Sequence, residues 1–216
     1  MRLCVAALAL FVALSDGFAV QRRQVLRPVD EAVSRPDFLA FRTQLIAAVA
    51  RRDASAILNI VDPSIKNSFG GDDGIDEFKR MWRLEESNRF WNEFGNVLRL
   101  GGSFDNANEF TAPYTFSRWP NNIDSFDYVA VVGTRVRMRT LPRLNAPVGG
   151  QVSHEILRLD MEAFSKDWRT EEWTAVRING RKMYIATRFI RSPIDYRAHF
   201  QYIDGRWWLN FFLAGD

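Results

Sequence analysis

Histidine is the residue type in this sequence best suited to acid–base or metal chemistry, and the chain has two, His154 and His199. A zinc site with three protein ligands would need both plus a carboxylate, and their separation fits no recognised ligand spacing. A Ser-His-Asp site would also use one of them, but no nucleophile-elbow motif is present. The sequence therefore predicts no catalytic residue and no metal ligand. His199 is interpreted as a surface or rim residue of a strand.

Carboxylates gather at Asp72, Asp73, Asp76 and Glu77, directly after a glycine turn. A calcium loop needs alternating acids, a central glycine and a later glutamate, and Gly74 and Glu77 do not fall at those positions. The interpretation is a solvated turn that leads into a helix, because acids complement the dipole at a helix N-terminus. No glycine-rich phosphate loop follows a strand, so no cofactor is predicted.

Composition and charge narrow the remaining classes of function. The chain has 216 residues, 47% of them hydrophobic, and a net charge of +3 with a pI of about 9.2. A nucleic-acid-binding protein should present a dense basic face, whereas Arg alternates here with Asp and Glu. No nucleic-acid partner is expected.

Residues 1–19 are predicted to be a secretory signal, with Arg2 as the positive start, Leu3–Leu14 as the apolar run and Gly17-Phe18-Ala19 at the cleavage position. The run is shorter than the about 20 apolar residues that span a bilayer. No stable membrane span is expected after signal removal, and an uncleaved anchor is the alternative. Cys4 is the single cysteine and lies in the signal, so packing must stabilise the mature chain. The expected location is periplasmic or secreted.

The N-terminal half is predicted to be mainly helical. Residues 20–35 form an extended lead-in, and apolar residues spaced by three and four then indicate a helix from Pro36 to about Arg51. Asp53 caps a second helix that carries Val61 and ends at Pro63. Further helices are predicted at Asp76–Trp82 and Ser87–Leu98, and short strands at Ser64–Phe69 and Tyr114–Phe116.

The C-terminal residues are predicted to form a β-hairpin. Tyr196–Ile203 and Arg206–Leu213 flank Asp204-Gly205, and an Asp-Gly pair between alternating apolar runs is a strong hairpin signal. An isolated hairpin is marginally stable in water, so its aromatic face needs a partner surface. The N-terminal helices are the expected partner, which makes the first domain discontinuous in sequence.

Residues 132–190 carry five short runs typical of strands, separated by Gly and Pro, and this pattern predicts a small β-barrel. The runs resemble the bacterial Src-homology-3 (SH3) domain family. The matching residues are Val136, Met138, Arg139 and Pro142 at the opening, Gly150 in the middle, Trp173 and Val176 in the tryptophan strand, and Gly180, Tyr184, Ile185, Phe189 and Ile190 at the end.

The resemblance implies a recognition module, which in envelope proteins binds peptidoglycan peptides or protein partners. Two features depart from the family pattern: Met183 stands where the family has glycine, and Asp160–Glu172 is longer than usual. We expect specificity to lie in this altered part. The predicted binding residues are Trp168, Trp173, Met183, Tyr184 and Arg139, although the strand aromatics also fit a core and Arg139 also fits a brace for the following loop.

The segment RRDASAILNIVDPSI is similar to the opening of the nuclear transport factor 2-like superfamily, whose fold is a cone-shaped α+β domain. Members of that superfamily include enzymes with an Asp or His in the cone. This resemblance implies a pocket, with Asp62 or Glu93 as a possible base. The residues expected to build the pocket are Trp82, Tyr114, Trp208 and Phe212.

The sequence thus predicts an α+β protein in which an SH3-like barrel at 126–193 is inserted into a helical α+β domain at 36–125 plus 194–216. The expected function is non-enzymatic binding of a cell-wall peptide or envelope protein. The alternative is a small-molecule-binding protein or an enzyme that uses an apolar pocket in the N-terminal domain. A purely structural assembly protein is the third possibility, and a homodimer is compatible with each.

Overall fold

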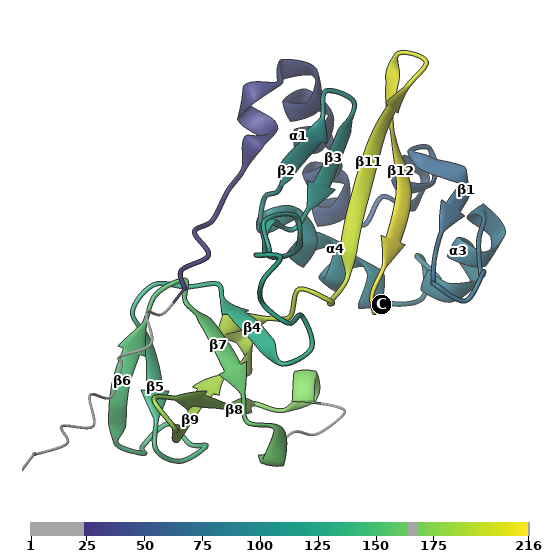
Figure 1. The fold of residues 1–216 in the computed structure, drawn as a ribbon. Coiled ribbons are helices and arrows are strands. Elements are labelled where there is room, and N and C mark those ends of the chain that lie inside the picture. The colour runs from purple at the N-terminus through teal and green to yellow at the C-terminus, as the bar shows by residue number, and fades with distance from the viewer. Residues whose placement is uncertain (1–23, 164–167, 216) are drawn as a thin grey trace, which may run out of the picture.

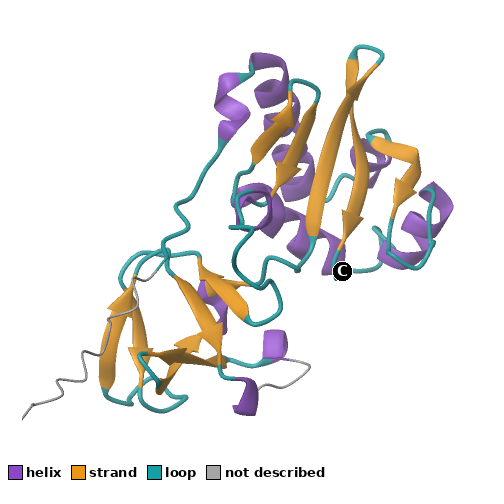
Figure 2. Ribbon diagram, in the orientation of Figure 1, coloured by secondary structure: helices purple, strands orange, loops and turns teal. Residues whose placement is uncertain are grey.

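The computed structural model describes residues 24–163 and 168–215. The predicted signal and Cys4 lie outside the described residues. The chain is an α+β protein with two sheets, one in the upper part of the view and one in the lower part (Figures 1 and 2). The strands of the second sheet fall between residues 128 and 191, which in sequence lie between strands of the first sheet.

The first sheet has five strands in the order β1-β12-β11-β3-β2. β1 pairs in parallel with β12, and the other neighbours are antiparallel. The strands are β1 (Val61–Lys66), β2 (Ser103–Asn106), β3 (Glu109–Ala112), β11 (Arg197–Ile203) and β12 (Arg206–Leu213).

Helices pack on one face of this sheet (Figure 2). Pro36 occupies the first turn of α1, and the Asp53 carboxylate caps α2 by accepting a hydrogen bond from the Ala56 amide at 3.0 Å, which confirms both predicted starts. The helices are α1 (Pro36–Arg51), α2 (Ala54–Leu58), α3 (Ile75–Trp82), α4 (Arg89–Arg99) and α5 (Tyr114–Ser117), with a short 3-10 helix η1 (Glu31–Ser34) before α1.

Two predicted segments are wrong. Pro63 lies inside β1 and does not end α2, which stops at Leu58. β1 is an edge strand, where the missing N–H of a proline is tolerated. The predicted strand Tyr114–Phe116 is helical, because the Pro113 carbonyl accepts hydrogen bonds from the amides of Phe116 and Ser117 at 2.9 and 3.1 Å.

The predicted C-terminal hairpin is confirmed. β11 and β12 pair along their length, and the turn residues Asp204 and Gly205 have φ values of 51° and 84°. Positive φ at both positions is what an Asp-Gly turn supplies. Ala198 and Phe200 of β11 are fully buried against the helices, so the N-terminal helices are the partner surface of the hairpin.

Aromatic rings fill the core between the first sheet and its helices. Phe38 of α1 is fully buried, with ring centroids of Phe110 and Trp207 at 4.3 and 4.6 Å. At the other end of the core the rings of Trp82 and Phe212 lie 5.0 Å apart. Offset and edge-on ring pairs add to the burial of their apolar area, so this core is the main source of stability in this half of the chain.

The second sheet has seven strands in the order β10-β4-β7-β8-β9-β5-β6, all antiparallel. Among the described residues its two end strands do not pair with each other, so the sheet is not the closed barrel that we predicted. The strands are β4 (Tyr128–Val131), β5 (Val136–Arg139), β6 (Val148–Val152), β7 (Ile156–Leu159), β8 (Trp173–Ile178), β9 (Arg181–Ala186) and β10 (Ile190–Arg191).

The second sheet has its own core, and Met183 belongs to it. Met183 is 8% exposed and packs with Val176 and Ile185. Its methyl group occupies the space above Gly149, where an added Cβ would lie 2.3 Å from Met183 Cε. The long side chain of Met183 therefore fills the space that is left because Gly149 has no side chain. This packing holds the Met183 side chain away from the binding surface on which we predicted it.

A segment that we call the strap, residues 24–35, bonds to both sheets. The Leu26 amide donates to the His154 carbonyl at 2.7 Å beside the second sheet. At the other end the Glu31 amide donates to the Gly102 carbonyl at 2.9 Å beside the first. The strap is extended up to Asp30 and then forms η1. In Figure 1 it runs as the purple chain from η1 and α1 down to the second sheet.

Tyr114 of α5 is buried in a small cluster with Leu26 of the strap, Ala130 of β4 and Ile156 of β7, which packs α5 and the strap against the second sheet. Its hydroxyl has no hydrogen-bond partner among the described residues. Burial raises the pKa of Tyr114 to about 12. The folded protein therefore holds this proton more tightly than the unfolded chain does.

We expect Tyr114→Phe to change how the free energy of unfolding depends on pH in alkaline solution. Between pH 10 and 12 the unfolded tyrosine ionises while the folded one stays neutral, so stability falls as the pH rises, by up to about 1.4 kcal/mol per unit. The phenylalanine variant lacks this loss, and its free energy of unfolding should fall less steeply. Urea titrations from pH 8 to 12 measure it, with Tyr184→Phe, on the half-buried Tyr184 of β9, as the control. Equal slopes for Tyr114→Phe and the parent protein would contradict the assignment.

Candidate functional site

Four of the five predicted binding residues lie on the second sheet. Arg139 of β5 is opposite Tyr184 of β9, and both are half-buried. The Arg139 guanidinium donates to the Ala146 carbonyl at 2.7 Å, so it braces the loop after β5. Trp173 of β8 is half-buried opposite Ala186. In this register Arg139, Tyr184 and Trp173 lie on the same face of the second sheet, whereas the buried Met183 lies on the other face.

Trp168 begins a 3-10 turn, η3 (Trp168–Thr170), in the predicted long segment, and its side chain lies outside the described residues. A second turn, η2 (Met161–Ala163), begins the same segment. Asp160 anchors this part of the chain: its side chain is fully buried and lies 3.2 Å from Arg177 and 3.5 Å from Lys182. The end of the segment leads into a cleft, which Arg169, Glu171 and Glu172 help to line.

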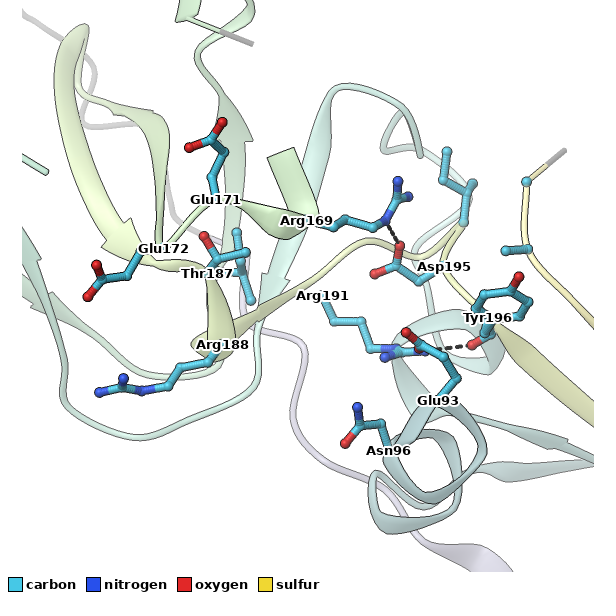
Figure 3. A pocket seen from close by; sticks show the side chains of 14 residues that line it. Glu93, Asn96, Arg169, Glu171, Glu172, Thr187, Arg188, Arg191, Asp195 and Tyr196 are labelled. Atoms are coloured by element: carbon cyan, nitrogen blue, oxygen red, sulfur yellow. Dashed lines mark hydrogen bonds and ion pairs between the residues drawn. The ribbon is translucent and has the colours of Figure 1, made fainter. Parts of the chain in front are cut away.

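This cleft has a volume of about 700 Å³ and lies where α4, the segment 169–172 and the connection from β9 to β11 meet (Figure 3). Part of it comes from the 3-10 turn η4 (Thr187–Phe189) and from β10. Three arginines and four carboxylates line it, together with polar and small residues: Arg169, Arg188, Arg191, Glu93, Glu171, Glu172, Asp195, Asn96, Thr187, Ile190, Ile194, Tyr196, Ala214 and Gly215.

Arg191 is the most deeply buried charged group of the cleft, with 8% of its surface exposed. It donates one hydrogen bond, from Nη2 to the Tyr196 carbonyl, at 2.6 Å. Its Nε has no hydrogen-bond partner among the described residues. Burial lowers the pKa of Arg191, and the charges of Asp195 and Glu93 raise it. An arginine stays protonated under such opposing influences, so the cleft contains a buried positive charge.

Asp195 holds the wall of the cleft together. Its carboxylate forms an ion pair with Arg169 and accepts a hydrogen bond from the Ser192 amide at 3.1 Å. The carboxylate therefore ties the predicted long segment to the connection that leads into β11. Asp195 is engaged on two sides, and Figure 3 shows Arg169 directed toward it.

Tyr196 closes the cleft on the side of the first sheet. Its hydroxyl accepts a hydrogen bond from Arg89 Nη2 at 2.6 Å. Burial raises the pKa of Tyr196, while the charge of Arg89 lowers it, and the net shift is upward. The ring packs against Trp82 and Phe212, with both centroids 5.1 Å away. Tyr196 thus connects the cleft to the aromatic core.

The opposite wall carries exposed charges. Glu171 and Glu172 come from the segment before β8, and Arg188 lies in η4, with its guanidinium 4.9 Å from the centre of the Phe189 ring. Figure 3 shows Glu171, Glu172 and Arg188 on the side of the cleft away from Glu93 and Tyr196. Neither glutamate forms an ion pair with a described residue. The cleft therefore has a buried cation on one side and uncompensated carboxylates on the other.

The alternative pocket in the N-terminal domain does not form from the predicted residues. Trp82 and Phe212 are packed against each other in the core, and Tyr114 belongs to a separate cluster beside the second sheet. Trp208 is half-buried, with Arg206 3.7 Å above its ring. The four side chains therefore enclose no common space.

The two predicted bases lie apart. Asp62 is on β1 and accepts a hydrogen bond from the Ser64 amide at 2.7 Å, whereas Glu93 of α4 lines the cleft. His199 contacts Asn210 through Nδ1 at 2.5 Å and stacks on Phe211. Within residues 24–163 and 168–215, no group of three histidine or acidic side chains is arranged to hold a metal ion.

A second cleft of about 680 Å³ lies beside β7 and β8. Its charged residues are Asp124, Arg158 and Arg177. Arg158 lies 3.5 Å from Asp127, and Arg177 is paired with Asp160 and Glu162. Both arginines are thus already compensated, which distinguishes this cleft from the one around Arg191.

Arg191, Asp195 and Tyr196 are the site residues that the predictions missed. The sequence holds one signal for them: an arginine follows the apolar end of a strand in FIRSPIDY, where a charge must be buried or turned outward. No described helix is long and apolar enough to cross a bilayer. Comparison with protein-family models, curated proteins and solved structures finds no match to this chain.

Proposed function

We propose that this is an exported, non-enzymatic recognition protein that binds a cell-wall peptide in the cleft around Arg191. In this proposal, residues 126–193 are an SH3-like module inserted into a helical domain formed by residues 36–125 and 194–216. The cleft lies at the boundary between these two parts, and Arg169, Glu171 and Glu172 at the end of the predicted long segment contribute to its lining.

The position of the strands supports the SH3-like interpretation. The tryptophan strand is β8, the glycine turn at Asn179-Gly180 has φ values of 47° and 74°, and the following strand is β9. These elements fall at the residues that resemble the family. The open strand order of the second sheet departs from a closed barrel, and the added segment before β8 is the other departure.

The observation that carries the proposal is the buried, incompletely paired Arg191 in a cleft that also bears exposed carboxylates. Ligand sites commonly combine a concave shape with a few converging polar groups. Charges of both signs suit a short peptide with its own charges of both signs. They do not suit a nucleic acid, whose phosphates need a continuous basic surface.

We expect the mature chain, residues 20–216, to co-sediment with purified peptidoglycan. Glu172→Lys reverses an exposed charge of the cleft wall and should weaken retention about fivefold or more, because charge complementarity at a binding surface is lost. Glu85→Lys is the matched control, since Glu85 is an exposed glutamate outside the cleft. Trp168→Ala tests the predicted aromatic contact in the same assay.

The proposal fails if the parent protein stays in the supernatant, or if both reversed-charge variants are retained as well as the parent protein. If the parent protein does not co-sediment with peptidoglycan but specifically captures one envelope protein, the result would instead favour a protein partner. In that case Glu172→Lys should still weaken capture more than Glu85→Lys, because the cleft would be the shared surface.

A further inference from the structure

We propose that the cleft recognises two charged groups of its ligand. Arg191 binds a carboxylate on one side of the cleft, and Glu171 with Glu172 bind an ammonium group on the other side. The ligand class is then a short peptide that carries a free carboxylate and a primary amine. This inference rests on the proposed function. It adds the two charged groups by which the ligand is selected, and it orients the bound peptide with its carboxylate toward Arg191 and its amine toward the glutamates.

Arg191 needs a partner that the described chain does not supply. Its one hydrogen bond among the described residues goes to a neutral carbonyl, and no described carboxylate forms an ion pair with it. Two carboxylates act on the charge of Arg191: Asp195 is already held by Arg169 and the Ser192 amide, and Glu93 forms no ion pair with Arg191 among the described residues. An incompletely bonded charge in a protein interior is costly. A ligand carboxylate would complete the guanidinium with charge-assisted hydrogen bonds, which are the stronger class.

Glu171 and Glu172 provide the second group. Both are exposed at the wall opposite Glu93, and the hydrogen bond recorded there uses the backbone: the Thr187 amide donates to the Glu172 carbonyl at 3.0 Å. Their carboxylates are thus available to a cation. A primary amine is a compact charge with three donors, which suits two adjacent carboxylates.

The balance of charge argues against a simple anion as the ligand. Three arginines and four carboxylates line the cleft, which gives a net charge of −1 for these groups (3 − 4). A phosphate or sulfate would meet Arg191 but would also face this excess of negative charge. A peptide with one carboxylate and one amine has no net charge, so it leaves the net charge of the cleft unchanged. It also supplies an opposite charge both to Arg191 and to the two glutamates.

Isothermal titration of the mature chain with synthetic peptides tests the inference. The reference probe is N-acetylated Ala-Ala-Lys-Ala with a free C-terminus. Its C-terminal amide removes the carboxylate, and norleucine in place of the peptide's lysine removes the amine. The N-acetylated, C-amidated peptide Ala-Glu-Lys-Ala moves the carboxylate to a side chain and so distinguishes the two sources of that group. We expect amidation to raise Kd about tenfold or more and norleucine to raise it about fivefold.

Two protein variants assign these effects to their residues. Glu171→Gln with Glu172→Gln should remove the preference for lysine over norleucine and keep the effect of amidation. Arg191→Gln should remove the effect of amidation and keep the lysine preference, with circular dichroism to check its fold. Because the glutamates are exposed, their double variant keeps the test valid even if Arg191→Gln unfolds. Glu85→Gln, an exposed glutamate outside the cleft, is the control and should match the parent protein.

The inference is overturned if the protein is retained by peptidoglycan yet binds none of these peptides, or binds all of them equally. It is also overturned if the glutamate variant keeps the lysine preference. If the parent protein is not retained by peptidoglycan, the result counts against the proposed function. If it is retained but does not discriminate among the peptides, the result counts against the two-group site alone.

Discussion

Replacing Phe38 by alanine is expected to lower the free energy of unfolding by about 3–5 kcal/mol. Phe38 is fully buried, and its ring lies 4.3 Å from Phe110, 4.6 Å from Trp207 and 5.4 Å from Phe104, measured between centroids. These partners come from three strands of the first sheet, so truncation leaves a cavity where α1 meets the sheet. Lost apolar burial and the cavity both add to the cost.

Urea denaturation followed by tryptophan fluorescence measures this loss. Leu39→Ala is the matched control, because Leu39 is the next residue of α1 and is 38% exposed. We expect its effect to stay below about 1 kcal/mol. A Phe38→Ala variant as stable as Leu39→Ala would show that α1 does not pack on the sheet as described, and would remove the support for the position of the cleft.

Gly102→Ala is expected to destabilise the protein by about 3 kcal/mol or more. A Cβ at this position would lie 2.2 Å from the Thr111 carbonyl oxygen and 2.9 Å from the Phe110 ring. The oxygen belongs to a paired strand, so relief requires a backbone shift in β3. The Gly102 carbonyl also accepts the strap hydrogen bond from Glu31, and that contact would move with it.

Thermal unfolding provides the measurement. For a chain of this length a loss of about 3 kcal/mol lowers Tm by about 6–12 °C. Gly70→Ala is the control, since a Cβ there would meet Ser68 Oγ at 3.4 Å and the turn is exposed. A Tm for Gly102→Ala within about 2 °C of the control would contradict the close approach of Gly102 to β3.

Local chemistry explains which elements could be predicted from the sequence. Asp204-Gly205 and Asn179-Gly180 need positive φ, and both adopt it. Pro36 marks a helix start because it has no N–H, which is not needed in the first turn of a helix. Asp53 marks a helix start because its carboxylate accepts a hydrogen bond from a backbone amide of the first turn. Each of these signals lies within a few residues of the feature that it determines, so neighbouring structure does not have to be known.

The errors occur where distant parts of the chain decide the outcome. Pro63 is compatible with a strand because β1 is at an edge, which its own sequence does not reveal. Met183 is a core residue because Gly149, on another strand, leaves room for its methyl group. The open order of the second sheet likewise depends on long-range pairing, so alternation within each strand could not distinguish it from a closed barrel.

The candidate site could be predicted in part. The long segment 160–172 was expected to influence specificity, and Arg169, Glu171 and Glu172 line the cleft. Arg191 was missed because its significance comes from burial against α4 and Asp195, which local sequence does not encode. Trp168 and Tyr184 remain predictions that a binding measurement can test.

The most direct test of the central claim is a map of amide chemical-shift changes in the mature chain on titration with soluble peptidoglycan fragments. The account predicts changes concentrated at residues 93–96, 169–172 and 187–196, where the cleft around Arg191 is built, and their loss in Glu172→Lys. Changes confined to the loop at 140–147 or to the second cleft at 122–124 and 177–180 would contradict it, as would a spectrum that the fragments leave unchanged.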